Sequence, residues 1–144
     1  MDPIICKHKI PSDKRYVELL TNYLTNLLRL GGYNKGNNKQ IKDIIFAFKI
    51  ALKRSIEFAY GDDTTSPLQV EFKVYSQKLE ITIRDYGKSY NPSKNTSSTL
   101  ADYEEKGLAL HIIEKTMDIV RYTAHHQKGG TLKLVKALKV AKNS

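Results

Sequence analysis

Hydrophobic residues recur along this chain with two different periods, and these periods predict its secondary structure. Strand-like alternation covers residues 4–10, and helical spacing follows at 16–28, where Gly31-Gly32 ends it, and at 38–60. Residues 68–75 and 79–83 alternate again and are joined by a short turn, as in a hairpin. A third helix is expected from Gly107, and a last hairpin covers 119–126 and 131–138. This order predicts an α+β fold, a two-layer sandwich with three helices on one face of a mixed, mostly antiparallel sheet.

The long helix expected over residues 38–60 carries apolar side chains on two faces. Phe46 and Ile50 lie nearly opposite the main stripe, on a face that they share with Arg54 and Glu57. A solvated face does not carry Phe and Ile in this way, so we expect both to be at least half buried by a pocket wall, another helix or a partner protein. The main stripe is assigned to the sheet and contains Ile41, Ile45, Phe48, Leu52, Ser55, Ile56 and Ala59.

Length and composition indicate one domain, 1–144, with an excess of positive charge. There are 24 Lys and Arg against 15 Asp and Glu, a formal charge of +9. This excess raises a basic nucleic-acid-binding module as an alternative, but the lysines are scattered and no nucleic-acid motif accompanies them. No apolar run approaches the ~20 residues of a membrane span. The single cysteine, Cys6, excludes an internal disulfide and suits a cytoplasmic protein.

Two short motifs indicate a nucleotide pocket. The first motif is Arg84-Asp85-Tyr86-Gly87, in which Asp85 stands at the end of the alternating strand over 79–83. Gly87 permits close approach of a ligand to the backbone. Gly107 is expected to open a helix, whose first N–H groups and positive dipole end suit phosphate. Residues 88–106 between the motifs are polar and lid-like. Each motif alone is more often a turn or a cap, and it is their combination that favours a nucleotide.

In this order the motifs resemble the Bergerat-fold (GHKL) ATP-binding family, and within it the anti-sigma-factor serine/threonine kinases of bacteria. Phe58-Ala59-Tyr60 stands where the family has His-Ala-Tyr, and residues 85–90 follow its Asp-x-Gly-x-Ser-Phe pattern. Gly130-Thr131-Leu132 stands where the family has Gly-Thr before its final strand. The resemblance implies a histidine-kinase-type ATPase fold over nearly the whole chain, with 88–106 as an ATP-lid-like loop.

The resemblance also implies a set of cofactor-binding residues. Asp85 would accept the adenine amino group, and Thr131 would hold Asp85 in place, directly or through water. The N–H groups of Gly107, Leu108 and Ala109 would face the phosphates, although the family usually has a second glycine at the position of Ala109. The full set is Asp85, Gly87, Arg54, Gly107, Leu108, Ala109 and Thr131.

Two positions depart from the family pattern. Counting back from Phe58-Ala59-Tyr60, the metal-binding Asn falls on Arg54 and the catalytic Glu falls on Ile50. A guanidinium repels Mg²⁺, and Ile has no proton-accepting group. Glu57 is a candidate replacement base, and pairing with Arg54 or Lys53 is its alternative role. We therefore expect ATP as cofactor with only a weak dependence on Mg²⁺, no metal ligand and no catalytic residue of the family type.

These features predict a cytoplasmic, anti-sigma-factor-like regulator of transcription in a stress response, with weak or lost kinase activity. The resemblance implies partner switching between a sigma factor and an anti-anti-sigma (STAS-type) protein, and a homodimer formed through the first helix and strand. The enzyme alternative is an active serine-protein kinase that phosphorylates the anti-anti-sigma protein. Neither a membrane nor direct nucleic-acid contact is expected.

Overall fold

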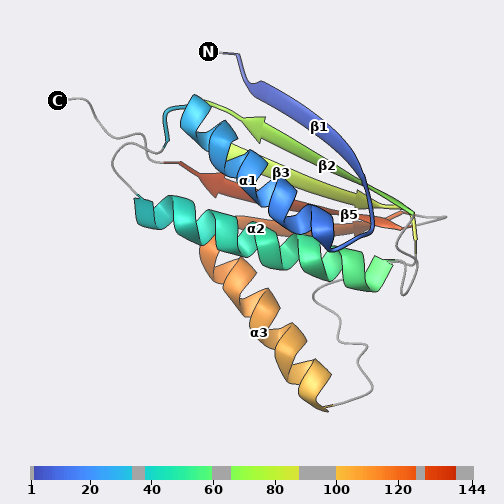
Figure 1. Ribbon diagram of the computed structural model, residues 1–144. Coiled ribbons are helices and arrows are strands. Elements are labelled where there is room, and N and C mark those ends of the chain that lie inside the picture. The colour runs from blue at the N-terminus through green and yellow to red at the C-terminus, as the bar shows by residue number, and fades with distance from the viewer. Residues whose placement is uncertain (1, 34–37, 60–65, 88–99, 126–128, 139–144) are drawn as a thin grey trace.

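The computed structural model describes residues 2–33, 38–59, 66–87, 100–125 and 129–138. The elements, in chain order, are β1 (Ile4–Pro11), α1 (Arg15–Leu30), α2 (Asn38–Ala59), β2 (Pro67–Val74), β3 (Lys78–Asp85), α3 (Leu100–Thr116), β4 (Ile119–Ala124) and β5 (Gly130–Ala137). The three helices lie on one side of the sheet, which confirms the predicted two-layer α+β sandwich (Figure 1).

The described strands form one sheet in the order β1-β2-β3-β5-β4, and each neighbouring pair is antiparallel. The prediction of a mixed, mostly antiparallel sheet is therefore wrong in its mixed part, although α3 does connect two strands that run in the same direction. Those strands, β3 and β4, are indeed co-directional, but β5 lies between them and pairs antiparallel with both. The single helical crossover therefore produces no parallel pair.

The core lies between the sheet and the helices. Alternate residues of β2 and β3 are buried, as the period-2 pattern predicts for a sheet covered on one face. Phe72 of β2 meets Phe48 of α2 edge to face, with ring centroids 5.2 Å apart. The other face of the sheet carries charged side chains, such as Glu80, which lies within 3.4 Å of the Lys78 ammonium.

The outer face of α2 only partly follows the sequence prediction. Ile50 is partly buried against the core, as expected. Phe46 is 54% exposed, so the expectation that it is at least half buried is wrong for this chain by itself. Ile41 and Ile45, which were assigned to the sheet-facing stripe, are partly buried against the core, and they also line a groove between α1 and α2. Among the described helices, none is both long enough and apolar enough to cross a membrane.

The third helix begins earlier than the sequence predicted. It starts at Leu100 rather than near Gly107, so residues 100–106 of the expected lid are helical. Leu, Ala, Glu and Lys, which are strong helix formers, make up most of this stretch, and their propensity extends the helix. The rest of the expected lid, 88–99, lies outside the described residues.

Candidate functional site

Asp85 is buried at the end of β3, with 4% of its surface exposed. Its side chain follows Ile83 on the face of the sheet that the helices cover. The carboxylate Oδ1 accepts a hydrogen bond from the backbone N–H of Gly87 at 3.2 Å, and the Gly130 N–H also donates to the carboxylate. Burial raises the pKa of the Asp85 carboxyl, while the two backbone N–H groups act in the opposite direction.

Two consecutive glycines, Gly129 before β5 and Gly130 at its first position, lie close to neighbouring strands. Gly129 has a φ of 69°, and a Cβ there would lie 2.1 Å from the backbone oxygen of Asp85. A Cβ at Gly130 would lie 2.2 Å from the Tyr122 hydroxyl oxygen. At Gly129, only glycine permits this approach without displacing the end of β3. The sequence analysis did not predict the contact of Gly129 with Asp85, although two consecutive glycines at the start of a strand are a usable signal.

Thr131 does not lie beside Asp85, so this predicted role is wrong. The register pairs Thr131 with Arg84 and Asp85 with Gly130. Since neighbouring residues of a strand point to opposite faces, the Thr131 side chain projects from the face opposite to Asp85. There its Oγ1 lies 2.7 Å from the His125 Nε2.

A second cluster of predicted residues surrounds a pocket of about 170 Å³ between α2 and α3. The predicted Arg54, Leu108 and Ala109 meet here, and Ile50 forms part of the wall. Asp85 lies outside this lining. Figure 1 shows that the end of β3 and the end of α2 lie toward the same side of the molecule. The sequence reading missed two further lining residues, Lys53 and Ile112.

Arg54 is a buried cation that pairs with Glu57. Its residue is 9% exposed, and its Nη1 lies 3.5 Å from the Glu57 Oε2. The other carboxylate oxygen of Glu57 lies 3.2 Å from the Lys14 ammonium. The alternative in which Glu57 pairs with Arg54 is therefore confirmed. A proton taken up by this carboxylate would compete with both ion pairs, which does not favour Glu57 as a general base.

The predicted phosphate-binding amides lie inside α3 rather than at its start. Gly107 is seven residues past Leu100, so the N–H groups of Gly107, Leu108 and Ala109 belong to the interior of the helix. Interior N–H groups donate to carbonyl groups one turn earlier and do not face a ligand. The expectation of a helix start at Gly107 is wrong, because the strong helix formers of residues 100–106 extend α3 toward its N-terminus.

The described residues hold no cluster suited to a metal ion. No group of three or more His, Cys, Asp or Glu side chains converges among them. At the position that the resemblance assigns to a metal ligand stands the Arg54 guanidinium, which is a donor only. The residues present do not fit Mg²⁺.

Comparisons with known proteins bear on the family and the fold of this chain. Residues 10–136 match the family profile described as histidine kinase-like ATPase domain. The serine-protein kinase RsbW of Bacillus subtilis (strain 168) is 27% identical over 138 residues, which cover 90% of this chain and 83% of the relative. RsbW of Listeria innocua serovar 6a is 25% identical over 122 residues, which cover 78% of this chain and 75% of the relative. The solved histidine kinase domain of the Erythrobacter litoralis EL346 blue-light-activated histidine kinase superposes with a TM-score of 0.54 at 14% identity. That superposition covers 90% of this chain and 62% of the solved chain.

Proposed function

Because the chain belongs to the histidine kinase-like ATPase (GHKL) family, we propose that it is a nucleotide-binding regulator of the anti-sigma-factor kinase type that acts by binding partner proteins. The observation that carries this proposal is the buried carboxylate of Asp85, held at the end of β3 by the backbone of the glycine turn. A buried carboxylate is costly unless its oxygens accept hydrogen bonds, and an adenine amino group would donate a further one.

Asp85 is the residue proposed to bind adenine. An ionised carboxylate offers about four acceptor positions, and two backbone N–H groups donate to this one. Acceptor capacity remains for the adenine amino group. Since the carboxylate is an acceptor only, it favours adenine, which presents an amino group, over guanine, which presents a carbonyl there. Gly87 leaves room for the base beside the strand end.

The phosphates are proposed to bind the cations of the α2–α3 pocket. Arg54 and Lys53 both line this pocket, so a phosphate bound there would lie beside two cationic side chains. Glu57 keeps a cation if Arg54 turns to the phosphate, because Lys14 also pairs with it. Hydrogen bonds between a guanidinium and phosphate oxygens contribute about 1.5–3 kcal/mol each. Arg54 thus supplies the charge that a metal ion supplies elsewhere, and nucleotide binding needs little or no Mg²⁺.

Phosphotransfer is proposed to be weak or lost. Ile50, at the position of the family's catalytic Glu, has no group that accepts a proton. Glu57 is engaged by two cations. The RsbW proteins are named serine-protein kinases, and this chain differs from the family pattern at both positions that kinase chemistry uses.

Regulation is proposed to proceed in the cytoplasm through a sigma factor and an anti-anti-sigma (STAS-type) protein. A homodimer through α1 and β1 accompanies this proposal. Exposed apolar side chains support it, because Leu19 of α1 is 59% exposed and Ile5 of β1 is 52% exposed. β1 is also an edge strand of the described sheet, with one side unpaired by another described strand.

Calorimetric titration with ATP and ADP, each with Mg²⁺ and with EDTA, tests the nucleotide proposal. We expect binding in both conditions, with less than about a tenfold difference in Kd, or 1.4 kcal/mol. A complete absence of binding at millimolar nucleotide refutes nucleotide binding. Incubation of the chain with labelled ATP and a STAS-type partner then tests the enzyme alternative, and rapid transfer of label to a partner serine shows that a working base exists.

A further inference from the structure

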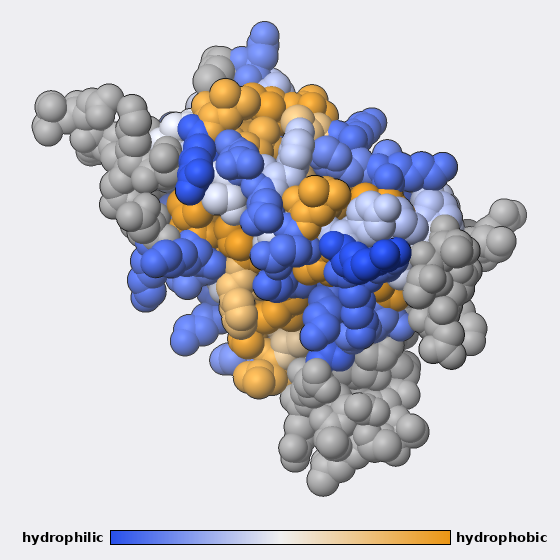
Figure 2. All heavy atoms as spheres, in the orientation of Figure 1, coloured by the Kyte–Doolittle hydropathy of each residue, from blue (hydrophilic) through white to orange (hydrophobic). Residues whose placement is uncertain are grey.

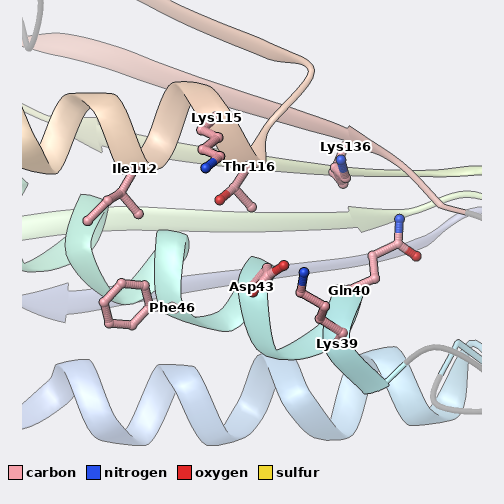
Figure 3. A pocket seen from close by; sticks show the side chains of 8 residues that line it. All are labelled: Lys39, Gln40, Asp43, Phe46, Ile112, Lys115, Thr116 and Lys136. Carbon is pink, nitrogen blue, oxygen red and sulfur yellow. The ribbon is translucent and has the colours of Figure 1, made fainter.

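Two grooves flank the N-terminal half of α2 on the helical face of the molecule. The first, about 420 Å³, lies between α1 and α2, and the second, about 440 Å³, lies between α2, the end of α3 and the end of β5. Phe46 lines both grooves and forms the ridge between them. In the second groove, Phe46 and Ile112 project from facing helices (Figure 3). We refer to the two together as the α2 grooves.

The α2 grooves have an apolar floor. Ile41 and Ile45 line the first groove, and Ile112 lines the second. Phe46 lies between them and is 54% exposed, so a large aromatic side chain is left uncovered by the described elements. Figure 2 shows hydrophobic surface on this face, interrupted by hydrophilic side chains. An exposed aromatic residue between two grooves is a typical anchor for a protein partner.

The rim of the α2 grooves is strongly basic. The linings contain one carboxylate, from Asp43, and six cationic side chains, so their net charge is five positive units. Even after the partners of two rim lysines, Glu18 and Asp118, are counted, three positive units remain. The first turn of α2, which lies here, has no acidic residue to offset the positive end of the helix dipole. The six cations are Arg29, Lys39, Lys42, Lys49, Lys115 and Lys136.

We propose that the α2 grooves are a docking surface for an acidic amphipathic helix of a partner protein. The apolar face of such a helix covers Phe46 and the groove floors, and its carboxylates meet the basic rim. The segment of this chain that follows β5 does not have this chemistry, because residues 139–144 contain two lysines and no acidic side chain. Nucleic acid matches the charge but leaves the apolar floor and Phe46 without a role.

This inference goes beyond the proposed function and does not depend on it. The linings of the α2 grooves and of the α2–α3 pocket share Ile112 and otherwise differ. Docking is therefore measurable without nucleotide, and it stands or fails separately from ATP binding.

A labelled synthetic peptide tests the proposal by fluorescence anisotropy. The probe is a helix of about 18 residues, or five turns, with Leu on one face and Glu on the other. We expect micromolar binding at about 150 mM salt. Phe46→Ala should weaken binding about tenfold or more. The double variant Lys39→Glu/Lys42→Glu, which reverses one charge in each groove, should have an effect of similar size.

Matched controls lie on the other face of the sheet. Ile119→Ala removes another exposed apolar side chain, 43% exposed on β4, and should leave peptide affinity unchanged. Lys7→Glu/Lys9→Glu on β1 changes the net charge by the same four units and should weaken binding much less than the groove pair does. Thermal unfolding of each variant confirms that it is folded.

Several results overturn the proposal. They are no binding of the peptide to the wild type, equal affinity for wild type and Phe46→Ala, and equal binding of a peptide in which Lys replaces every Glu. Tighter binding of a random DNA duplex than of the peptide, with a steep salt dependence and no effect of Phe46→Ala, assigns the surface to nucleic acid instead.

Discussion

The substitution Asp85→Asn tests the nucleotide site most directly. It removes the negative charge while it keeps the shape of the side chain and an oxygen that can accept from the Gly87 N–H. The new amide group also brings N–H donors toward the adenine amino group, which is itself a donor. A hydrogen bond to a charged group contributes about 1.5–3 kcal/mol, so we expect the Kd for ATP to rise about 10- to 150-fold.

The same substitution that weakens ATP binding should favour the folded state at neutral pH. Burial raises the pKa of the Asp85 carboxyl, so the folded state holds its proton more tightly than the unfolded state. The contribution of Asp85 to stability is therefore fully present below the ordinary pKa of an aspartate. It is lost as the pH rises through the raised pKa of the folded state. At neutral pH the wild type holds a costly buried charge that Asn does not carry. The free energy of unfolding of Asp85→Asn relative to wild type should rise from acid to neutral pH.

Two measurements on the same samples check both parts of this prediction. Calorimetry gives the Kd for ATP, and urea denaturation at acid and at neutral pH gives the two differences in unfolding free energy. Asp43→Asn, an exposed aspartate of α2, is the control and should change neither quantity. Unchanged ATP affinity in Asp85→Asn refutes the assignment of Asp85 to the pocket. The reasoning about burial is refuted if the free energy of unfolding of Asp85→Asn, relative to wild type, falls from acid to neutral pH.

Four further substitutions test the remaining assignments. Arg54→Asn should make ATP binding depend on Mg²⁺ in calorimetry without restoring phosphotransfer, and transfer by this variant alone would show that a base is already present. Gly129→Ala should cost about 2–4 kcal/mol in urea denaturation, because it combines a φ of 69° with a Cβ 2.1 Å from a backbone oxygen. Its control Gly32→Ala, with a φ of 84° in open space, should cost only about 1–2 kcal/mol, and equal losses would contradict the contact. Gly107→Ala, inside α3 with nothing within 4 Å of the new Cβ, should raise the free energy of unfolding by up to about 1 kcal/mol, and a loss would indicate that this residue is not helical. Thr131→Ala should leave the Kd for ATP within about twofold, whereas a tenfold rise would place its side chain in the pocket.

The sequence by itself determined the order and type of the elements and the family. The period of apolar residues is a local property, because it depends only on which side chains of one element must face the core. It can therefore be read from the sequence without the tertiary structure. Leu79, Ile81 and Ile83 therefore predicted the strand and the place of Asp85 at its end. The position of Arg54, four residues after Ile50, likewise predicted that these side chains share one face of α2, and both line the same pocket.

The tertiary structure decided what depends on register, on neighbouring elements and on competition between local preferences. Thr131 faces away from Asp85 because the register of β3 with β5 pairs Asp85 with Gly130, and a shift of one residue in that pairing would exchange the two faces. Helix propensity extended α3 past Gly107 and removed the expected helix start, although the glycine itself favoured a boundary there. Phe46 remains exposed because α1 and α3 pack on either side of it and leave grooves between them. The placement of those three helices is a property of the whole core, and no stretch of sequence encodes it locally.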